Sequence, residues 1–480
     1  MAGEKIRTLS ITDFRFGLNT YDMAHEIGEN QSPDLQNVDL SRKGKTATRT
    51  GIAKLNTTVI TSATGIFGAF YGKTAHLVAA LTDVYKLNTS TWVYESIKGT
   101  LTSNAQTFFD EWENYVYAVN GADAPWKWTG SVVSALTAPN ASWAAAPPNY
   151  ICKHGRRLFA LTASSSLLTW CAEDLPDQWL TTTYPDDAGE EPISPNNGYA
   201  GTGIVSQKSG LVIFKAQGIY KLTGKTPISY LVTELYSTIG CIAPRSIINI
   251  ENRIIFLARY KGDYAVFALD DAGGLTHLSA AITTTLNTIT TASANLASAV
   301  SYKDKYKLSF PVSGGWRTVN LFYKSGGWEF DSGNSMRCYY IASDTLYGGA
   351  TGSGQVYTMD TGTADDATAI TSYVKSKDYY MGAPTLVKTL HNIVIWVKAS
   401  GNWAATLNLY IDSTLYRSSW SVQLGTKGGT ETTRCLVIPM NVDVQGGMLA
   451  IKIGTSTINQ PFELYRAELN YSISGDTAEK

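Results

Sequence analysis

The densest group of side chains that could do acid–base or metal chemistry is acidic. It consists of Asp186, Asp187, Glu190 and Glu191. Two carboxylates held several ångströms apart across a cleft can hydrolyse a glycosidic bond, and grouped carboxylates can bind a divalent cation. Proline and glycine residues bound the group, so we expect a solvated loop. In an assembly, this loop would be a candidate channel loop or contact loop. A weak cation site and catalysis remain the alternatives.

Other residues with chemical potential lack the spacing that chemistry requires. The five histidines occur singly, and the five cysteines are scattered, so neither type forms a metal-binding motif or a disulfide framework. The sequence also lacks a G-x-S-x-G elbow, a Walker A loop and a strand-linked G-x-G-x-x-G. We therefore expect a protein that is not an enzyme and that holds no metal and no cofactor.

A basic group near the N-terminus could meet phosphate. It comprises Arg42, Lys43, Lys45 and Arg49, and lysine and arginine supply the salt-sensitive part of nucleic-acid affinity. The surrounding NVDLSRKGKTATRTG has the pattern of a strand, a tight turn at Lys43 and Gly44, and a second strand. A hairpin whose tip is kept soluble by charge is the favoured interpretation.

Tryptophans along the middle of the chain could stack against sugars. They are Trp112, Trp126, Trp128, Trp179 and Trp328. Because they recur at similar places in a repeat, packing between neighbouring sheets is the favoured interpretation.

Composition and charge narrow the function further. The 480 residues include 44% hydrophobic and only 16% charged residues, with 28 Tyr and 42 Gly, a profile typical of strands and tight turns. The formal net charge of -1 provides no general attraction to nucleic acid or to a membrane. No apolar run is long enough for a spanning helix, and Met1 to Leu9 lack the apolar core of a signal peptide, so we expect folding in a cytoplasm.

A degenerate repeat organises the middle of the chain. Short β-rich runs meet at a polar turn and continue into an apolar strand, and these turns recur at intervals of 39 to 53 residues. The turn centres are Lys73, Glu113, Gly155, Lys208, Glu251, Asp304 and Ser343. Such a period is typical of four-stranded propeller blades, so the sequence predicts an all-β fold with a β-propeller of about seven blades over 59–360. The two longest intervals, which contain 181–198 and 278–299, are predicted to be projecting loops, the second with a short helix.

The ends of the chain follow other patterns. After a small, acidic linker at 360–370, alternating strands separated by Gly- and Asn-rich turns predict a C-terminal β-sandwich over 366–475. Residues 1–58 fit neither pattern and are interpreted as an N-terminal arm with strands that close the ring.

Two stretches carry a resemblance to a known family. The first contains F-x-x-G-L-N-T, S-P-D-x-x-N-V-D and R-x-G within residues 13–51, and the second runs from GRRLFAL through LTWCAEDLPDQW to GLVIFKAQGIYKLTG and GCIAPRSIINIENRIIFLA. Over most of residues 10–360 the chain resembles the β-propeller tail proteins of short-tailed bacteriophages, known as tail nozzle, tail hub or packaged-DNA stabilisation proteins.

The resemblance implies a structural virion protein located in the virion tail. Several copies, with six as the expected number, would form a ring that extends and closes the DNA channel below the portal and adaptor. Partners would be further copies of the chain, portal-proximal tail proteins, tail fibre or spike proteins, and DNA in transit without sequence-specific binding. A receptor- or glycan-binding tail protein is the alternative, and a glycan-degrading enzyme is a third reading.

Four apolar residues of the N-terminal segment are candidates for the assembly interface. Phe14, Phe16, Leu18 and Tyr21 could anchor an arm against the neighbouring blade or subunit, together with Arg42, Lys43 and Lys45 at the adjoining hairpin. The alternative is that the four simply pack within the first blade.

Overall fold

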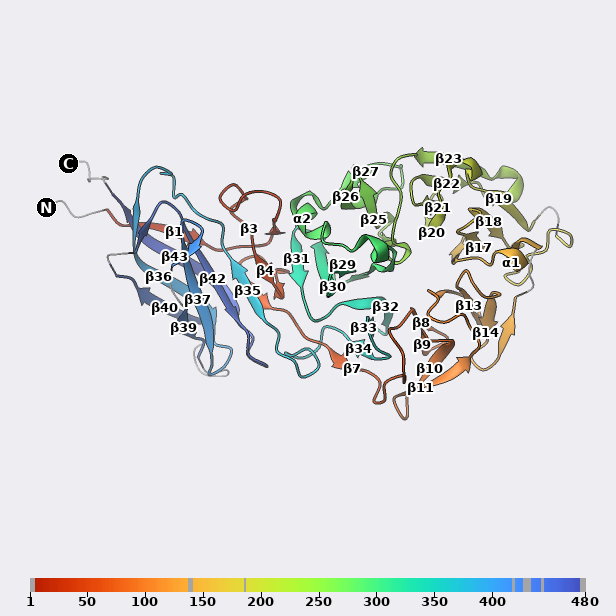
Figure 1. The fold of residues 1–480 in the computed structure, drawn as a ribbon, viewed down its shortest axis with the longest axis horizontal. Helices are drawn as coiled ribbons and strands as arrows, with labels where there is room; N and C mark the ends of the chain where they lie inside the picture. The colour runs from red at the N-terminus through yellow and green to blue at the C-terminus, as the bar shows by residue number, and fades with distance from the viewer. Residues whose placement is uncertain are drawn as a thin grey trace.

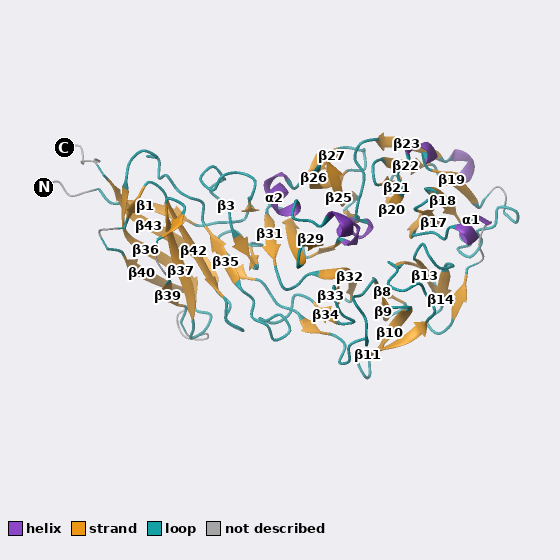
Figure 2. Cartoon of the chain, in the orientation of Figure 1, coloured by secondary structure: helices purple, strands orange, loops and turns teal. Residues whose placement is uncertain are grey.

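The computed structural model describes residues 5–136, 141–184, 187–416, 419–425, 433–441 and 444–474. Strands dominate this part of the chain (Figure 2), which confirms the all-β class. The helices are short: α1 (Ala141–Ala145), α2 (Thr283–Leu286) and the 3-10 turns η1 (Pro195–Asn197), η2 (Pro227–Ser229), η3 (Pro244–Ser246), η4 (Ala280–Ile282) and η5 (Thr291–Leu296).

Seven antiparallel sheets, numbered here in chain order, occupy the middle of the molecule, and each is built on four strands. Sheet one holds β8 (Gly68–Gly72), β9 (Ala75–Ala80), β10 (Asp83–Asn88) and β11 (Val93–Lys98); sheet two holds β12 (Phe108–Trp112), β13 (Tyr115–Val119), β14 (Trp126–Trp128) and β15 (Val133–Ala135); sheet three holds β16 (Tyr150–His154), β17 (Arg157–Thr162), β18 (Leu167–Trp170) and β19 (Gly189–Pro192). Sheet four holds β20 (Gly201–Gln207), β21 (Gly210–Lys215), β22 (Ile219–Thr223) and β23 (Leu231–Tyr236); sheet five holds β24 (Ile248–Ile250), β25 (Arg253–Tyr260), β26 (Asp263–Leu269) and β27 (Leu275–His277). Sheet six holds β28 (Ser298–Tyr302), β29 (Lys305–Val312), β30 (Gly315–Phe322) and β31 (Trp328–Asp331), and sheet seven holds β32 (Met336–Ala342), β33 (Thr345–Ala350), β34 (Val356–Thr358) and β7 (Ala53–Lys54).

The first hairpin of every sheet turns where the sequence predicts. Each of the seven turn centres lies in the two-residue connection between the first and second strands. In four of these turns both connecting residues have positive φ, as in Lys73 (51°) and Thr74 (57°). Two successive residues of positive φ match the right-handed twist of the flanking strands, so local turn chemistry sets the register of these hairpins.

The seven sheets lie around a common centre (Figure 1). The first strand of each sheet contacts the first strand of the next, and β32 of sheet seven contacts β8 of sheet one. A buried apolar cluster also joins sheets seven and one through Ile66, Val78 and Tyr340. Burial of apolar area between neighbouring sheets is therefore the main stabilising contribution, and it continues around the cycle.

The five tryptophans named in the sequence analysis all lie in buried apolar clusters. Each is at most 3% exposed, and Trp126 and Trp128 pack between sheets one and two. The packing interpretation is therefore confirmed, and a sugar-binding platform made of these residues is wrong.

Two further sheets face each other at the end of the molecule that holds both termini (Figure 1). Sheet eight holds β36 (Lys388–Lys398), β40 (Thr433–Pro439), β41 (Gln445–Gly446), β43 (Glu463–Ile473), β1 (Arg7–Ile11), β5 (Val38–Asp39) and β6 (Thr46–Thr48); sheet nine holds β35 (Ser372–Lys375), β37 (Ala404–Ile411), β38 (Thr414–Leu415), β39 (Trp420–Gln423), β42 (Leu449–Thr455) and β4 (Leu35–Gln36). Their inward side chains, such as Ile395 and Leu469 from sheet eight and Leu407 from sheet nine, belong to one buried cluster.

The N-terminal segment connects the two parts of the molecule. Besides β1, β4, β5 and β6 in the end sheets, it provides β2 (Gly17–Leu18) and β3 (Gln31–Ser32) to sheet six and β7 to sheet seven. Asn56 follows β7, is fully buried, and accepts hydrogen bonds from Gln355 Nε2 and Val356 N on sheet seven. The expectation that a strand of this segment completes a sheet is confirmed by the pairing of β7 with β34.

Two expectations about irregular segments are wrong. Glu190 and Glu191 lie in β19 rather than in a loop, because they pair with β18. The predicted short helix of 278–299 is present as α2, but the segment does not project, since Ile282 and Leu286 are fully buried. The linker is held in place because Ile52 N and Thr361 N donate to carbonyls across a short ladder between residues 51–52 and 361–366.

Candidate functional site

A charged cavity of about 460 Å³ lies between sheet six and sheet eight. Strands β29 and β31 of sheet six contribute Lys305, Lys307 and Glu329 to its lining, and the N-terminal hairpin β5–β6 and its flanks contribute Asp39 and Arg49. We call this group, with Asp331 and Asp365, the junction network.

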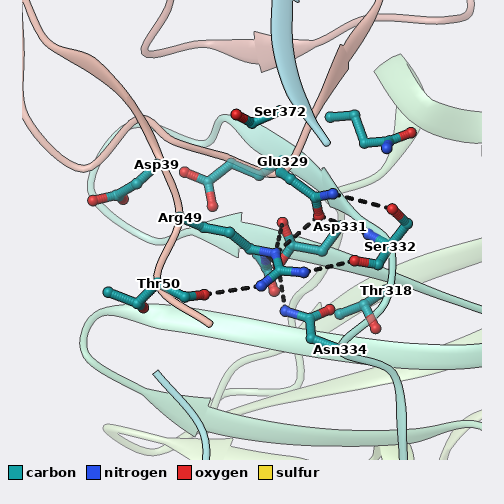
Figure 3. A network of polar contacts seen from close by, with 12 residues as sticks. Asp39, Arg49, Thr50, Thr318, Glu329, Asp331, Ser332, Asn334 and Ser372 are labelled. Atoms are coloured by element: carbon teal, nitrogen blue, oxygen red, sulfur yellow. Dashed lines mark hydrogen bonds and ion pairs between the residues drawn. The ribbon is translucent and has the colours of Figure 1, made fainter. Parts of the chain in front are cut away.

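Arg49 is the centre of the junction network (Figure 3). Its side chain is 7% exposed, and its three nitrogens donate five hydrogen bonds. Nη1 and Nη2 form a fork on the Asp365 carboxylate at 2.9 and 2.6 Å, and Nη2 also donates to Ser332 O at 2.6 Å. Burial disfavours its charge, but the hydrogen bond to Asp365 and the nearby Asp331 raise the pKa of Arg49 above its ordinary value.

Lys305 and Glu329 form a second buried pair. Lys305 Nζ lies 2.8 Å from Glu329 Oε2 and 3.0 Å from Asp39 Oδ1, and Leu40 N donates to Glu329 Oε1 at 2.7 Å. Burial raises the pKa of Glu329 to about 7 against the opposing effect of Lys305. Although burial alone would lower it, the pKa of Lys305 is raised by Glu329 and Asp39, so the ammonium stays charged.

Asp331 is the third buried acid of the network. Asn320 and Asn334 each donate a side-chain N–H to its Oδ2, at 2.8 and 3.0 Å. Burial would raise the pKa of Asp331, but Arg49 and Lys307 lower it, so the carboxylate is held ionised.

The chemistry available here is mutual neutralisation of charges that come from three segments. The N-terminal hairpin, sheet six and residues 360–366 each provide at least one ionic group, and most of these groups are already paired. Removing one partner of such a buried pair leaves an uncompensated charge, which costs several kcal/mol. The junction network therefore fixes the position of the end sheets relative to sheet six.

The sequence motifs of the N-terminal segment map onto this junction. In S-P-D-x-x-N-V-D, Asp34 accepts hydrogen bonds from Lys452 Nζ and Tyr373 Oη on sheet nine, and Asn37 accepts one from Arg49 Nε. A Cβ at Gly51 would lie 1.9 Å from Ala364 O, and a Cβ at Gly17 would lie 2.0 Å from Trp328 O. The motifs thus contain the residues that fasten the two parts together.

The predicted basic group is divided by the structure. The hairpin is present, because β5 pairs with β6, and Arg42 and Lys43 are exposed at its tip. Lys45 forms an ion pair with Glu463 on β43 at 3.2 Å. The assignment of Arg49 to a phosphate-facing group is wrong, since every N–H of its guanidinium is used inside the protein.

The four predicted N-terminal anchors also divide into two kinds. Phe14 and Leu18 are each 4% exposed and pack in the large core that includes sheet six, rather than in the first sheet. Phe16 and Tyr21 are 42% and 67% exposed. Only this second pair is available to another molecule.

The acidic candidates lie on the far side of the molecule from the junction. Asp187 forms an ion pair with Arg157, whose side chain is only 3% exposed, while Glu190 and Glu191 are exposed on β19. Asp186 lies outside the described residues. Among the residues that are described, no three His, Cys, Asp or Glu side chains are grouped so that they could hold a metal ion.

The residues of the junction network could not be selected from the sequence as a site. Arg49 and Asp365 are separated by 316 positions, and nothing in their local patterns couples them. The sequence feature that pointed to this region was the concentration of motifs within residues 13–51, because a simple arm would not need so many.

Comparison with known proteins adds little to this geometry. No protein family matches the chain, and no curated protein matches it either. Among solved structures, a computationally designed protein named Ika8 aligns with 9% identity and a TM-score of 0.38 over 64% of this chain and 99% of that one. A chain of the mitotic checkpoint complex aligns with 10% identity and a TM-score of 0.40 over 60% of this chain and 87% of that one.

A third structure is the extracellular domain of a proposed one-component system from B. thetaiotaomicron, with 11% identity and a TM-score of 0.43 over 82% of this chain and 50% of that one. At these TM-scores the three likenesses carry no argument about the fold or the function. Within the described residues, the helices are too short and too polar to cross a membrane.

Proposed function

We propose that residues 59–360, closed by β7, form a seven-bladed β-propeller and that residues 366–475 form a β-sandwich. The cyclic contacts between first strands and the apolar cluster joining sheets seven and one support the propeller. The shared core of sheets eight and nine supports the sandwich. The strands of residues 1–58 then belong to both units, which makes the segment a connector rather than a free arm.

The function we propose is that of a structural protein of a short-tailed bacteriophage tail, forming the nozzle or hub ring around the DNA path. The motif resemblance over residues 10–360 is the source of this proposal. The observation that carries it furthest is the junction network, because it fastens the two units with buried ion pairs. A ring that holds pressurised DNA needs subunits whose parts do not swing relative to one another.

The proposal assigns the exposed pair Phe16 and Tyr21 to the contact between neighbouring copies, with Arg42 and Lys43 at the adjoining hairpin tip. Exposed aromatic residues are enriched where proteins associate. It also expects a channel surface that is not strongly basic, since the chain carries 39 basic and 40 acidic residues and DNA must slide without being held.

Copy number tests the proposal. Quantitative mass spectrometry of purified particles should find about six copies of this chain per particle, as expected for a nozzle ring. Absence from the particles would contradict the structural role and favour an enzyme, in which case turnover should disappear when Asp187, Glu190 and Glu191 are replaced. Location of the chain in peripheral trimeric projections, rather than in a ring below the portal, would favour a receptor-binding protein.

A further inference from the structure

The centre of the seven sheets contains a second cavity, of about 220 Å³. It is lined from the first strands of six sheets, by residues that include Phe108, Tyr150, Gly203, Ile248, Ala299 and Cys338. Because those strands surround the common centre, the cavity lies on the axis of the seven-sheet part. Polar and apolar surface contribute about equally to its lining, which includes the charged Arg245.

Arg245 crosses this axis. It lies in η3, just before the first strand of sheet five, and its Nη2 donates to Phe67 O at 2.6 Å and Thr107 O at 2.7 Å. Those carbonyls precede the first strands of sheets one and two. The guanidinium also stacks on Phe108, with Cζ 4.5 Å from the ring centroid.

Arg337, on β32 of sheet seven, approaches Arg245 beside the cavity without being part of the cavity lining. Its Cζ lies 3.8 Å from the centroid of the Phe67 ring, so both arginines contact Phe67. Arg337 Nε is buried and has no hydrogen-bond partner in the part of the chain that the structure describes. Burial lowers the pKa of Arg337, and the neighbouring charge of Arg245 lowers it further.

These two cations lack a counter-charge. No carboxylate of the described residues forms an ion pair with either arginine, and burial lowers the pKa of Arg245 as well. Arg245 and Arg337 are half-buried, and two like charges held close together in partly desolvated surroundings are costly without compensation. The fully buried arginines Arg49 and Arg157 each have an acidic partner.

We propose that one small oxyanion binds beside the axial cavity, between Arg245, which lines the cavity, and Arg337, which contacts the same Phe67. The planar guanidinium fork matches the oxygens of a phosphate, sulfate or carboxylate group. The cavity volume exceeds the roughly 30 Å³ that one water occupies in the liquid, so such an ion fits with some of its hydration. Tyr150 lines the same cavity, and its hydroxyl group can donate a hydrogen bond.

The test is isothermal titration calorimetry of the full chain with sodium phosphate, sodium sulfate and sodium acetate at constant ionic strength. At least one of the three should bind saturably with one site per chain. Binding by phosphate and sulfate alone assigns a tetrahedral anion, whereas binding by acetate alone assigns a carboxylate. The absence of saturable heat for all three would overturn the proposal.

Variants assign the binding to these arginines. R245Q and R337Q should each weaken binding at least about tenfold, the magnitude of a lost charge-assisted hydrogen bond. R317Q is the matched control and should bind as the wild type does, because Arg317 also stacks on a ring, that of Phe330, but lines a separate cavity. Equal weakening in R317Q, or undiminished binding in R337Q, would contradict the assignment.

Thermal unfolding in chloride buffer separates binding from folding. R337Q should melt at or above the wild-type temperature without the oxyanion, since an uncompensated charge is removed. R337K, which keeps the charge but loses the fork, should fold and still bind at least about tenfold more weakly. A lower melting temperature of R337Q in chloride, with unchanged anion binding, would show a packing role against Phe67 instead.

Discussion

At the scale of single residues, Arg49 and Glu329 show how the junction uses buried charge. Both are almost fully buried, at 7% and 2% exposure, but their surroundings have opposite effects on their charged forms. Arg49 meets acceptors on every N–H, which raises its pKa, whereas Glu329 has a raised pKa because burial outweighs its single close cation. Arg49 therefore holds the junction together as a charged group, whereas the ionisation of Glu329 is costly at neutral pH.

Replacing Arg49 should destabilise the junction between sheet six and the end sheets. R49A leaves Asp365 and Asp331 buried without their main cation, so we expect the free energy of unfolding to fall by about 3 to 5 kcal/mol. R42A, at the exposed tip of the same hairpin, should change it by less than about 0.5 kcal/mol. Urea denaturation of both variants provides the comparison, and equal effects would contradict the network.

Glu329 should give stability a specific pH dependence. Its pKa is about 7 in the folded protein, raised from its ordinary value of 4.5, so the folded state retains a proton that the unfolded chain releases at lower pH. Wild-type stability relative to E329Q should therefore be highest below about pH 4.5 and should decline up to about pH 7, by at most about 3 kcal/mol. Urea titrations of both proteins at pH 5 and pH 8 measure this difference, and a difference that rises with pH would contradict it.

At the scale of elements, the sequence specified what is local and missed what is distant. The seven first hairpins were predictable because their polar turns and apolar strands are adjacent in the chain. Strands β2, β3, β4, β5 and β7 have two residues each, too few for any periodicity to be read. Phe14, Phe16 and Leu18 have the spacing of one strand face, but a turn at residues 15–16 sends Phe16 to the surface while the other two enter the core.

The closing strand β7 should depend on Asn56. N56A removes the acceptor for Gln355 Nε2 and Val356 N, both of which are buried, so we expect a loss of about 2 to 4 kcal/mol in the free energy of unfolding. T58A, two residues further on and exposed, should change stability by less than about 0.5 kcal/mol. If chemical denaturation finds N56A as stable as T58A, the closure does not rest on this residue.

The exposed aromatic pair should matter for assembly and not for folding. The double variant F16S/Y21S should unfold at the wild-type temperature, because both side chains face solvent, and should fail to enter particles in a complementation assay. F14A and L18A should instead lose about 3 kcal/mol or more each, because each leaves a cavity in the core. Normal incorporation of F16S/Y21S would remove this pair from the interface.

At the scale of the whole molecule, one segment of the chain holds two units in a fixed relation. Residues 5–56 run from the end sheets to sheet six, back to the end sheets, and on to sheet seven. The all-β class and the number of repeats could be predicted from the sequence, whereas this interleaving could not, because it depends on pairings between positions about 300 or more apart. A rigid subunit of this kind suits a ring that confines DNA.

Cryo-electron microscopy of the virus particles in which the proposal places this chain tests the central claim most directly. The account predicts a symmetric ring of this chain, with six copies, enclosing the DNA path below the portal and adaptor, and with Phe16 and Tyr21 at contacts between copies. Location of the chain in peripheral projections away from the DNA path, or its absence from the particle, would contradict it.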